Sequence, residues 1–451
     1  MKKTVALITV IVMALALAVS GLPTANVSAD SSETYLVNFK GNKLPSNVET
    51  IIEEAGGEVI QSNEDMNYVR VSSSNPNFLK QIRSNKAVAD AGRELYIEQE
   101  TVVVKEDFDG ADHPLYEQYQ WDIKQVTQDG ASYNLPKGKG SKDVVVAVID
   151  TGIDQNHPDL KANIVDAKSF VPGETVTDYD GHGTHVAGSI AANGNVLGVG
   201  PELGIAALKV FPREGGAPTA WIVEAIRYAA DQDYDVINMS LGSYQFLQNP
   251  DSNTSDIVAN INLFRKAIAY AEQKGVTVVG SAGNNGMDLK SPGQMTKYLF
   301  GENGATKRNP ASNLLIRVSA GNKGKELAFY SNYGVGMIDV MAPGGDLGPN
   351  YDPETGEGRD NTYLSLSTVP IFDENGEPVG HGYGWSAGTS MAAPKVAGVA
   401  GVIIAKHGKN KLKPAQVKAI IKQSAEDVYK KGYDAYSGHG LVNAYSALQH
   451  K

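Results

Sequence analysis

Short apolar runs that alternate with helical patterns are the feature that most limits the fold of this chain. Runs typical of buried strands cover residues 143–150, 205–211, 235–241, 276–283, 315–320 and 337–342. Helical patterns lie between several of them, such as AWIVEAIRYAADQ after Thr219 and NINLFRKAIAYAEQKG, which ends at Gly275. Near-continuous apolar strands are typical of parallel sheets that are buried on both faces. Residues 115–451 therefore predict an α/β fold, a mostly parallel sheet covered by helices on both faces.

The segment before this region has a different pattern. Residues 35–40 are typical of a strand, and LPSNVETIIEEAGG of a helix. Two short strands, EVIQSN and MNYVRVS, precede a second helix in NPNFLKQIRSN and an extended stretch in AGRELYIEQETVVV. The order β-α-β-β-α-β is typical of a small two-layer α+β domain. We expect such a domain over residues 31–105 and a polar, acidic linker and processing zone over residues 106–114.

The first residues follow the layout of a signal peptide. Two lysines precede an apolar run from Thr4 to about Val19, and small residues follow as far as Ala29. The run is short for a membrane span, which needs about 20 apolar residues. We therefore expect a signal peptide over residues 1–29, cleaved after Ala29, and a secreted, extracellular product. An uncleaved membrane anchor is the alternative.

The charge and the cysteine content exclude several classes of function. The formal net charge is −11, from 51 acidic and 40 basic residues, and the chain has no cysteine. An acidic protein without clustered basic residues does not fit nucleic-acid binding. Catalysis by a thiol, thiolate metal sites and disulfides are excluded. We expect a monomer that binds no nucleic acid and, once the signal peptide is removed, no membrane.

Three short blocks in a fixed order carry the groups of a nucleophilic reaction. AVIDTGID surrounds Asp150, DGHGTHVAG surrounds His182 and GTSMAAPKVAG surrounds Ser390. A serine hydroxyl is a weak nucleophile at neutral pH, so it needs a base that takes its proton and an acid that orients the base. Histidine, with a pKa near ~6.5, suits the base. The order Asp, His, Ser matches one known type of catalytic triad.

Each block alone has a simpler explanation. Asp150 ends a strand, where aspartate is common in turns. Ser390 begins a helix, where serine is a frequent N-cap. His185 competes with His182 as the base, but their spacing and the missing glutamate do not match a helical zinc site, so we expect His185 to be packed within its helix. The three blocks together outweigh these explanations.

Two further segments are candidates for contact with a substrate. Asn284 in SAGNNG follows a strand and can donate its side-chain amide to an oxyanion, beside the backbone N–H of Ser390 at a helix N-terminus. Ser240, Leu241 and Gly242 follow another strand, whose edge can bind a peptide as an extra strand. A loop asparagine and an ordinary strand end are the alternatives.

The quoted blocks resemble those of the subtilisin-like serine proteases, the subtilases. The resemblance covers about residues 115–451, including the closing SGHGLVNAYSA, and APKV is similar to bacterial secreted members that include the lantibiotic leader peptidases. It implies that Asp150 is the triad acid, His182 the general base, Ser390 the nucleophile and Asn284 the oxyanion donor. The segment over residues 31–105 resembles the family's propeptide, which assists folding and blocks the cleft.

The chain departs from the family's pattern in two places. Asp159 matches one calcium ligand of typical Bacillus enzymes, but the loop AANGNVLGVG is shorter than theirs. The resemblance implies no cofactor for the chemistry and leaves a structural calcium ion open. Insertions at residues 287–310 and 346–384 fall where the walls of the family's substrate pocket lie. The side-chain preference of the family is therefore not carried over.

These observations predict a secreted serine endopeptidase that hydrolyses a protein or peptide substrate through an acyl-enzyme. We expect it to be made as a zymogen that processes itself, with its own propeptide as an intramolecular inhibitor. A dedicated leader peptidase for a lantibiotic-type precursor is the alternative to a broad degradative protease. A non-catalytic, peptide-binding member would lack a triad residue, and a lipase-like hydrolase needs GxSxG, which AGTSMAA does not contain.

Overall fold

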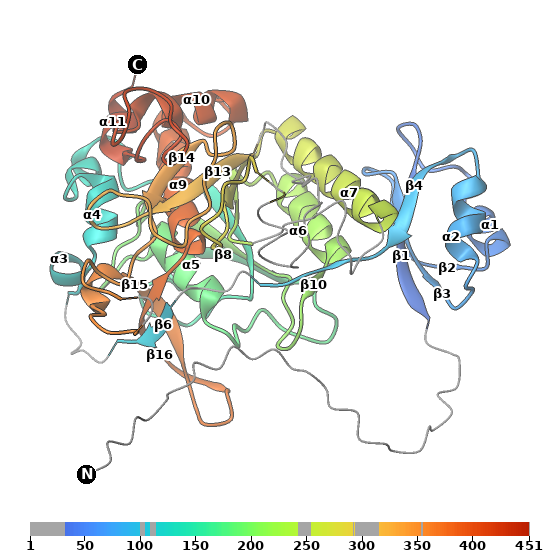
Figure 1. Cartoon of the computed structure of the whole chain (residues 1–451), viewed down its shortest axis with the longest axis horizontal. Coiled ribbons are helices and arrows are strands. Elements are labelled where there is room, and N and C mark those ends of the chain that lie inside the picture. The colour runs from blue at the N-terminus through green and yellow to red at the C-terminus, as the bar shows by residue number, and fades with distance from the viewer. Residues whose placement is uncertain are drawn as a thin grey trace, which may run out of the picture.

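A computed structural model describes residues 32–99, 104–108, 114–241, 254–291, 293, 315–352 and 355–450. The described chain forms a large domain and a small N-terminal domain that lies beside it (Figure 1). The predicted signal peptide, residues 1–29, lies outside the described residues.

A seven-stranded sheet forms the centre of the large domain. Its order is β14-β13-β12-β11-β7-β9-β8, and all neighbouring strands are parallel. The strands are β7 (Val145–Asp150), β8 (Ile164–Ser169), β9 (Gly204–Lys209), β11 (Val236–Met239), β12 (Thr277–Ser281), β13 (Ile316–Gly321) and β14 (Val340–Pro343). The predicted α/β fold with a mostly parallel sheet is confirmed. The edge strand β8 was not predicted, because its sequence IVDAKS is half-exposed and has no apolar run.

Helices cover both faces of this sheet. α5 (His182–Ala191) and α9 (Thr389–His407) pack on one face, and α6 (Thr219–Asp231) and α7 (Thr254–Gln273) pack on the other. Successive side chains of β7 point to opposite faces, as a strand requires. Val146 and Val148 therefore join the core around α5 and α9, whereas Ala147 and Ile149 join the core around α6 and α7. Burial on both faces explains why the strand is apolar from Val145 to Ile149.

Shorter helices complete the large domain. They are α3 (Tyr116–Tyr119), α4 (Trp121–Thr127), α10 (Pro414–Ser424), α11 (Ala444–Gln449) and the 3₁₀ helices η1 (Ala131–Asn134) and η2 (Asn361–Tyr363).

A second, three-stranded sheet lies at the edge of the large domain (Figure 1). Most of the hairpin of β15 (Ser365–Phe372) and β16 (Pro378–Ala387) lies within the region predicted as an insertion, residues 346–384, and β16 continues three residues beyond it. The strand β6 (Val104–Asp107) pairs antiparallel with β16. Part of the predicted linker and processing zone is thus a strand on the large domain.

The small domain has the predicted order of elements. Its sheet has the order β2-β3-β1-β4. The elements are β1 (Glu33–Phe39), α1 (Val48–Glu54), β2 (Glu58–Asn63), β3 (Tyr68–Ser73), α2 (Phe78–Ser84) and β4 (Val88–Arg93). The two helices and one face of the sheet enclose a separate apolar core.

The small domain packs against α6 and α7. A Cβ at Gly92 of β4 would lie 2.4 Å from Cα of Asp256, so strand and helix touch where no side chain intervenes. The carboxylate of Glu224 accepts hydrogen bonds from Asn63 at 2.6 Å and from the Tyr68 hydroxyl at 2.9 Å. Beyond β4, β5 (Tyr96–Ile97) pairs antiparallel with β10 (Ala217–Pro218). This pairing leads the chain from the small domain onto the large one.

Candidate active site

Asp150 lies at the carboxyl end of β7, where functional residues gather in parallel sheets. Its side chain is buried, and Oδ1 accepts hydrogen bonds from Nδ1 of His182 at 2.7 Å and from the backbone N–H of Thr151 at 2.8 Å. The backbone bond fixes the direction of the carboxylate. The carboxylate in turn orients the imidazole.

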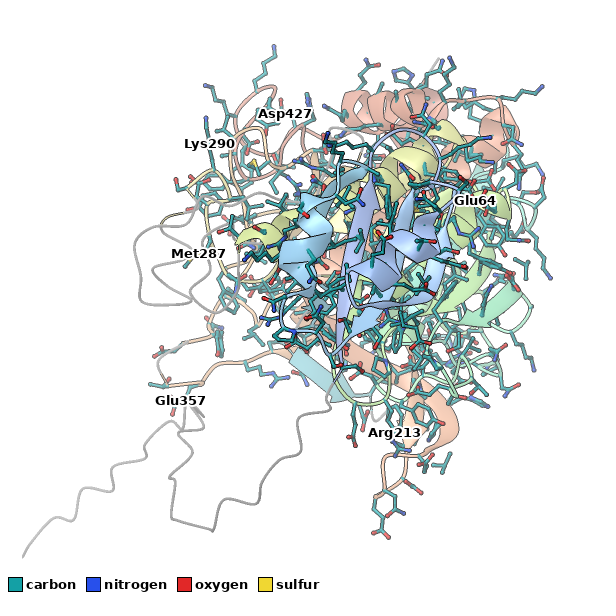
Figure 2. All side chains as sticks on the ribbon, turned by 90° about the vertical axis from the view of Figure 1, so that its right-hand side faces the viewer. Glu64, Arg213, Met287, Lys290, Glu357 and Asp427 are labelled. Atoms are coloured by element: carbon teal, nitrogen blue, oxygen red, sulfur yellow. The ribbon has the colours of Figure 1, made fainter. Side chains whose placement is uncertain are left out.

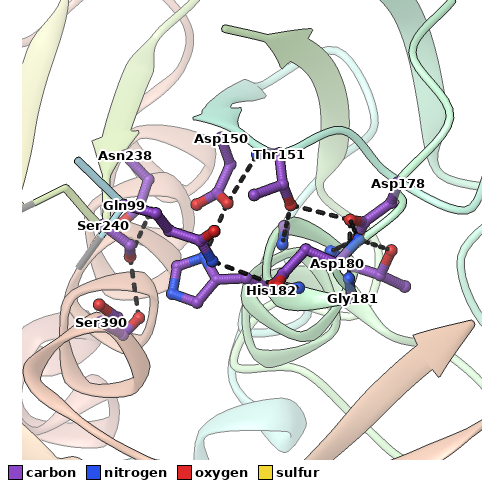
Figure 3. Close-up of polar contacts among 12 residues, drawn as sticks. Gln99, Asp150, Thr151, Asp178, Asp180, Gly181, His182, Asn238, Ser240 and Ser390 are labelled. Atoms are coloured by element: carbon purple, nitrogen blue, oxygen red, sulfur yellow. Dashed lines mark hydrogen bonds and ion pairs between the residues drawn. The ribbon is translucent and has the colours of Figure 1, made fainter. Parts of the chain in front are cut away.

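His182 is the first residue of α5, which follows a left-handed glycine, Gly181, with φ of 92°. A Cβ at Gly183 would lie 2.1 Å from the carbonyl oxygen of Gly152, so a residue with a side chain would separate α5 from the turn after β7. Glycine at this position lets the helix start against Asp150. The approach places the imidazole between Asp150 and Ser390 (Figure 3).

A buried carboxylate that the sequence analysis missed supports this helix start. Asp178 accepts hydrogen bonds from the backbone N–H groups of Gly181 and Thr184 and from the hydroxyls of Thr184 and Thr151. Burial raises the pKa of Asp178, and these hydrogen bonds oppose that rise. The signal in the sequence is an aspartate three residues before the glycine that precedes the helix, close to a helix start, where carboxylates that accept backbone N–H bonds are favoured.

The environment of His182 favours its protonated form. Burial lowers the pKa, but the charge of Asp150 and its hydrogen bond, with smaller contributions from Asp180 and Asp178, outweigh burial and raise the pKa of His182 to about 9. Nε2 is buried and has no hydrogen-bond partner among the described residues. When it is neutral, the imidazole can accept a proton at Nε2, and its surroundings then stabilise the resulting charge.

Ser390 is the second residue of α9 and is fully buried in this structure. Its backbone carbonyl accepts a hydrogen bond from the hydroxyl of Ser240 at 2.8 Å, and Nδ2 of Asn238 donates to that hydroxyl at 3.0 Å (Figure 3). Ser240 thus lies directly behind the first turn of α9. Leu241 is buried, and Gly242 lies outside the described residues.

Asn284 lies beside the turn that leads into α9. Its Oδ1 accepts hydrogen bonds from the backbone N–H of Thr389 at 2.8 Å and from the Thr389 hydroxyl at 2.9 Å. Its Nδ2 would lie 3.2 Å from a Cβ at Gly388. The amide group of Asn284 is therefore held against the backbone immediately before Ser390, where a donor to an oxyanion would have to be.

A buried ion pair, also missed by the sequence analysis, joins the helix of Ser390 to α4, and Ser365 connects it to the helix of His182. Lys395, five residues after Ser390, lies 2.8 Å from the carboxylate of Asp122 in α4, and both side chains are fully buried. Lys395 also donates to the hydroxyl of Ser365 at 2.9 Å, and the carbonyl of Ser365 lies 3.2 Å from Nε2 of His185. Burial, with the charge of Lys395, lowers the pKa of His185 to about 3. His185 is thus a neutral packed residue of α5, as expected.

Asp159, the predicted calcium ligand, is contacted by hydrogen-bond donors of its own chain. Its Oδ2 accepts hydrogen bonds from the backbone N–H of Val196 at 3.0 Å and from the Tyr383 hydroxyl at 3.2 Å. A Cβ at Gly194 would lie 2.0 Å from Oδ1, so the loop is packed directly on the carboxylate. Calcium takes about six to eight oxygen ligands, which include carboxylates and backbone carbonyls, and both of these contacts to Oδ2 come from hydrogen-bond donors instead. Hydrogen-bond donors of the chain itself thus contact the carboxylate of Asp159.

We therefore expect the contribution of Asp159 to stability to be independent of calcium. Asp159→Ala should lower the melting temperature by the same amount in excess calcium and in a chelator, because the donors of Val196 and Tyr383 lose their acceptor in both. A calcium site at about one hundred times its Kd would add about 2.7 kcal/mol. A loss of stability that appears in calcium alone would contradict this prediction. Tyr383→Phe, which removes one of the two donors, is the matched variant.

The segment that leaves the small domain approaches His182 and Ser390 from two sides. Nε2 of Gln99 donates to Oδ1 of Asp180 at 3.0 Å, two residues before His182 (Figure 3). Val104 pairs with Ala387, three residues before Ser390. The described residues that flank positions 100–103 therefore lie beside the loop before the histidine and beside the strand before the serine.

Among the helices of the described residues, none has the length and apolar character needed to cross a membrane.

Known proteins resemble this chain over most of its length. A sequence model of the Subtilase family matches residues 141–440. Subtilisin amylosacchariticus from Bacillus subtilis subsp. amylosacchariticus is 31% identical over 433 residues, which cover 93% of this chain and 92% of the relative.

Solved structures of proteases also resemble this chain over most of its length. The crystal structure of the epidermin leader peptide processing serine protease from Staphylococcus aureus matches with a TM-score of 0.75 and 26% identity, over 93% of this chain and 98% of that chain. The structure of the nisin leader peptidase NisP from Lactococcus lactis matches with a TM-score of 0.62 and 28% identity, over 75% of this chain and 95% of that chain.

Proposed function

The chain belongs to the subtilase family of serine proteases, and we propose that it is a secreted endopeptidase that uses Asp150, His182 and Ser390 as its triad and is made as an inhibited precursor. The observation that carries the proposal is the 2.7 Å hydrogen bond between Asp150 and His182, next to a serine at the start of a buried helix.

The proposed reaction begins with attack of the Ser390 hydroxyl oxygen on the carbonyl carbon of the peptide. Nε2 of His182 takes the hydroxyl proton and then gives it to the leaving amine, while the charge of Asp150 stabilises the imidazolium. The backbone N–H of Ser390, at a helix N-terminus, and the side-chain amide of Asn284 donate to the oxyanion. Water then hydrolyses the acyl-enzyme with His182 as base, which releases the acid and restores Ser390.

The small N-terminal domain is the proposed intramolecular inhibitor. Its contacts with α6 and α7, and the pairing of β5 with β10, support this role, since they direct the uncut chain toward His182 and Ser390. Gln99 lies on one side of these residues and Val104 on the other. We propose that self-processing cuts the chain between them.

N-terminal sequencing of the processed enzyme tests this proposal. The expected new N-terminus lies after Gln99 and no later than Val104, and the processed enzyme should react with a fluorophosphonate probe. A new N-terminus at residues 109–114, within the predicted linker, would contradict the proposed position of the cut. Failure of the processed enzyme to label would contradict the proposed nucleophile.

A dedicated leader peptidase is the second candidate for the substrate. The likeness to the epidermin leader peptide processing protease supports it, because that likeness extends beyond the large domain into the N-terminal domain. The similarity to subtilisins over 93% of the chain supports a broad protease instead. A peptide library separates the two, since a broad preference for apolar residues before the cleaved bond would reject the leader peptidase.

A further inference from the structure

Two oppositely charged side chains lie in the interior of the large domain. Charged groups normally stay in water, as Glu64, Lys290 and Asp427 do at the surface of the molecule (Figure 2). Lys395 of α9 and Asp122 of α4 are instead fully buried, 2.8 Å apart. The desolvation of a buried ion pair often cancels its attraction, and apolar side chains of similar volume are frequently as stable. A contribution to stability therefore does not explain this pair.

The helix start that contains the nucleophile lacks a hydrogen bond of its own backbone. Pro394 lies within α9. Proline has no N–H, so Pro394 cannot donate to the carbonyl of Ser390, four residues earlier, and its ring crowds that carbonyl. The hydroxyl of Ser240 donates to it instead. Groups outside the helix backbone are thus needed to fix the first turn of α9.

Lys395 is one of these groups. An ammonium group has three N–H donors, and each of the three has an acceptor. The acceptors are the carboxylate of Asp122, the hydroxyl of Ser365 at 2.9 Å and the backbone carbonyl of Met391 at 3.0 Å. Met391 directly follows Ser390, so Lys395 holds the backbone next to the nucleophile.

Ser365, at the start of β15, extends these contacts to the helix of the base. Its hydroxyl donates to the carboxylate of Asp122. Its backbone carbonyl accepts a hydrogen bond from Nε2 of His185 at 3.2 Å, about one turn after His182 in α5. The cluster of Lys395, Asp122 and Ser365 therefore contacts both helices that contain proposed catalytic residues.

The helix of Asp122 is itself fixed to the same strand. On either side of Ser365, the ring N–H of Trp121 donates to the carbonyl of Leu364 at 2.9 Å, and the side-chain amide of Gln120 donates to the carbonyl of Leu366 at 3.2 Å. Three consecutive residues of the chain, 120–122, thus bind three consecutive residues of the other segment, 364–366. Asp122 cannot shift without breaking these bonds.

We infer that Lys395 and Asp122 are positioning residues, which hold α9 at a fixed place relative to α5 so that the hydroxyl of Ser390 stays within reach of Nε2 of His182. Proton transfer requires the two atoms to lie within hydrogen-bond distance. A misplacement of about 1 Å, caused by a change far from the reacting atoms, can slow a reaction about 10²-fold. The inference rests on the proposed function and adds two residues that touch neither the substrate nor the reacting atoms.

A double variant separates positioning from stability. Lys395→Met together with Asp122→Val leaves no buried charge unpaired, so its melting temperature should stay near that of the wild type. On a peptide substrate, we expect kcat of the processed enzyme to fall by about tenfold or more with KM unchanged. This pattern indicates an interaction that acts on the transition state and not on substrate binding. Titration with a fluorophosphonate counts the active sites.

Ser365→Ala is the second variant. It keeps both charges and removes the hydroxyl that joins them to β15, so kcat should fall severalfold with little loss of stability. Lys418→Met is the control. Lys418 also pairs with an aspartate, Asp339, at 3.0 Å, and it donates to the carbonyl of Leu315, just before β13. That is the amino end of the parallel sheet, whereas Asp150 lies at the carboxyl end. Lys418→Met should lower the melting temperature and leave kcat unchanged.

Wild-type kcat in the folded double variant would overturn the inference, and so would wild-type kcat in Ser365→Ala if the double variant does not fold. An equal loss of kcat in Lys418→Met would overturn it as well, because the loss would then follow stability and not position. If the wild-type enzyme neither cuts the peptide nor reacts with the fluorophosphonate, the proposed function fails, and the inference with it.

Discussion

Replacing Ser390 with alanine is expected to leave the chain uncut at the bond between the small and large domains and to prevent labelling by a fluorophosphonate. The hydroxyl oxygen is the attacking atom in the proposed reaction, and the first turn of α9 contains no second serine that could replace it. Loss of the nucleophilic serine in a subtilisin lowers turnover by about 10⁶-fold, and we expect the same order here. Gel electrophoresis and intact mass measure the outcome.

The fold should survive this change, because alanine removes one oxygen atom and keeps the backbone carbonyl that Ser240 binds. Added wild-type enzyme should therefore cut the Ser390→Ala chain at the same bond. Ser367→Ala is the control. Ser367 is equally buried, but its hydroxyl donates to the backbone carbonyl of His185, where β15 packs against α5. Self-processing of purified Ser390→Ala at the normal rate would disprove the proposed role.

Replacing Asp150 with asparagine is expected to slow the reaction by about 10⁴-fold, the loss seen when a triad aspartate becomes an amide and the histidine takes the wrong tautomer. In the uncut chain the pKa of His182 is about 9. His182 is thus protonated at neutral pH and cannot accept the proton of Ser390. The rate of self-processing of the wild-type chain should therefore rise with pH up to about 9.

In Asp150→Asn the carboxylate no longer opposes the effect of burial, so the pKa of His182 should fall and the pH profile should shift toward acid. Asp180→Asn is the matched control. Asp180 accepts a hydrogen bond from the backbone N–H of His182, not from its ring, and its charge contributes less to the raised pKa. We expect a smaller shift of the profile and no loss of the correct tautomer. A profile in Asp150→Asn that matches the wild type would show that Asp150 does not set the pKa of His182.

The sequence predicted the structural features that depend on residues close to one another in the chain. Apolar runs predicted six of the seven strands of the main sheet, because burial on both faces makes most positions of such a strand apolar. The half-exposed edge strand β8 has no such pattern and was missed. The glycines around His182 and the helix that follows Ser390 are local signals, and they pointed to the residues that the fold brings together.

Several features of the site depend on residues that are far apart in the chain. Ser365 and Asp122, which meet at the buried Lys395, are separated by 243 positions. Ser240 was predicted as part of a peptide-binding edge, and that role stays a prediction. The structure adds that its hydroxyl donates to the backbone carbonyl of Ser390, 150 positions away. The pattern of residues within one helix or strand does not predict such pairs. Each side chain, taken alone, is compatible with an ordinary exposed or packed position.

The sequence by itself determined the fold class and singled out the residues proposed as the acid, the base and the nucleophile, because each lies at a strand end or helix start that its own neighbours specify. The tertiary structure alone decided what surrounds them. It placed β6 and the β15–β16 hairpin beside the nucleophile, and it closed the loop of Gly194 and Val196 on Asp159. These contacts join separate elements, so they arise from packing of the whole domain rather than from local propensity.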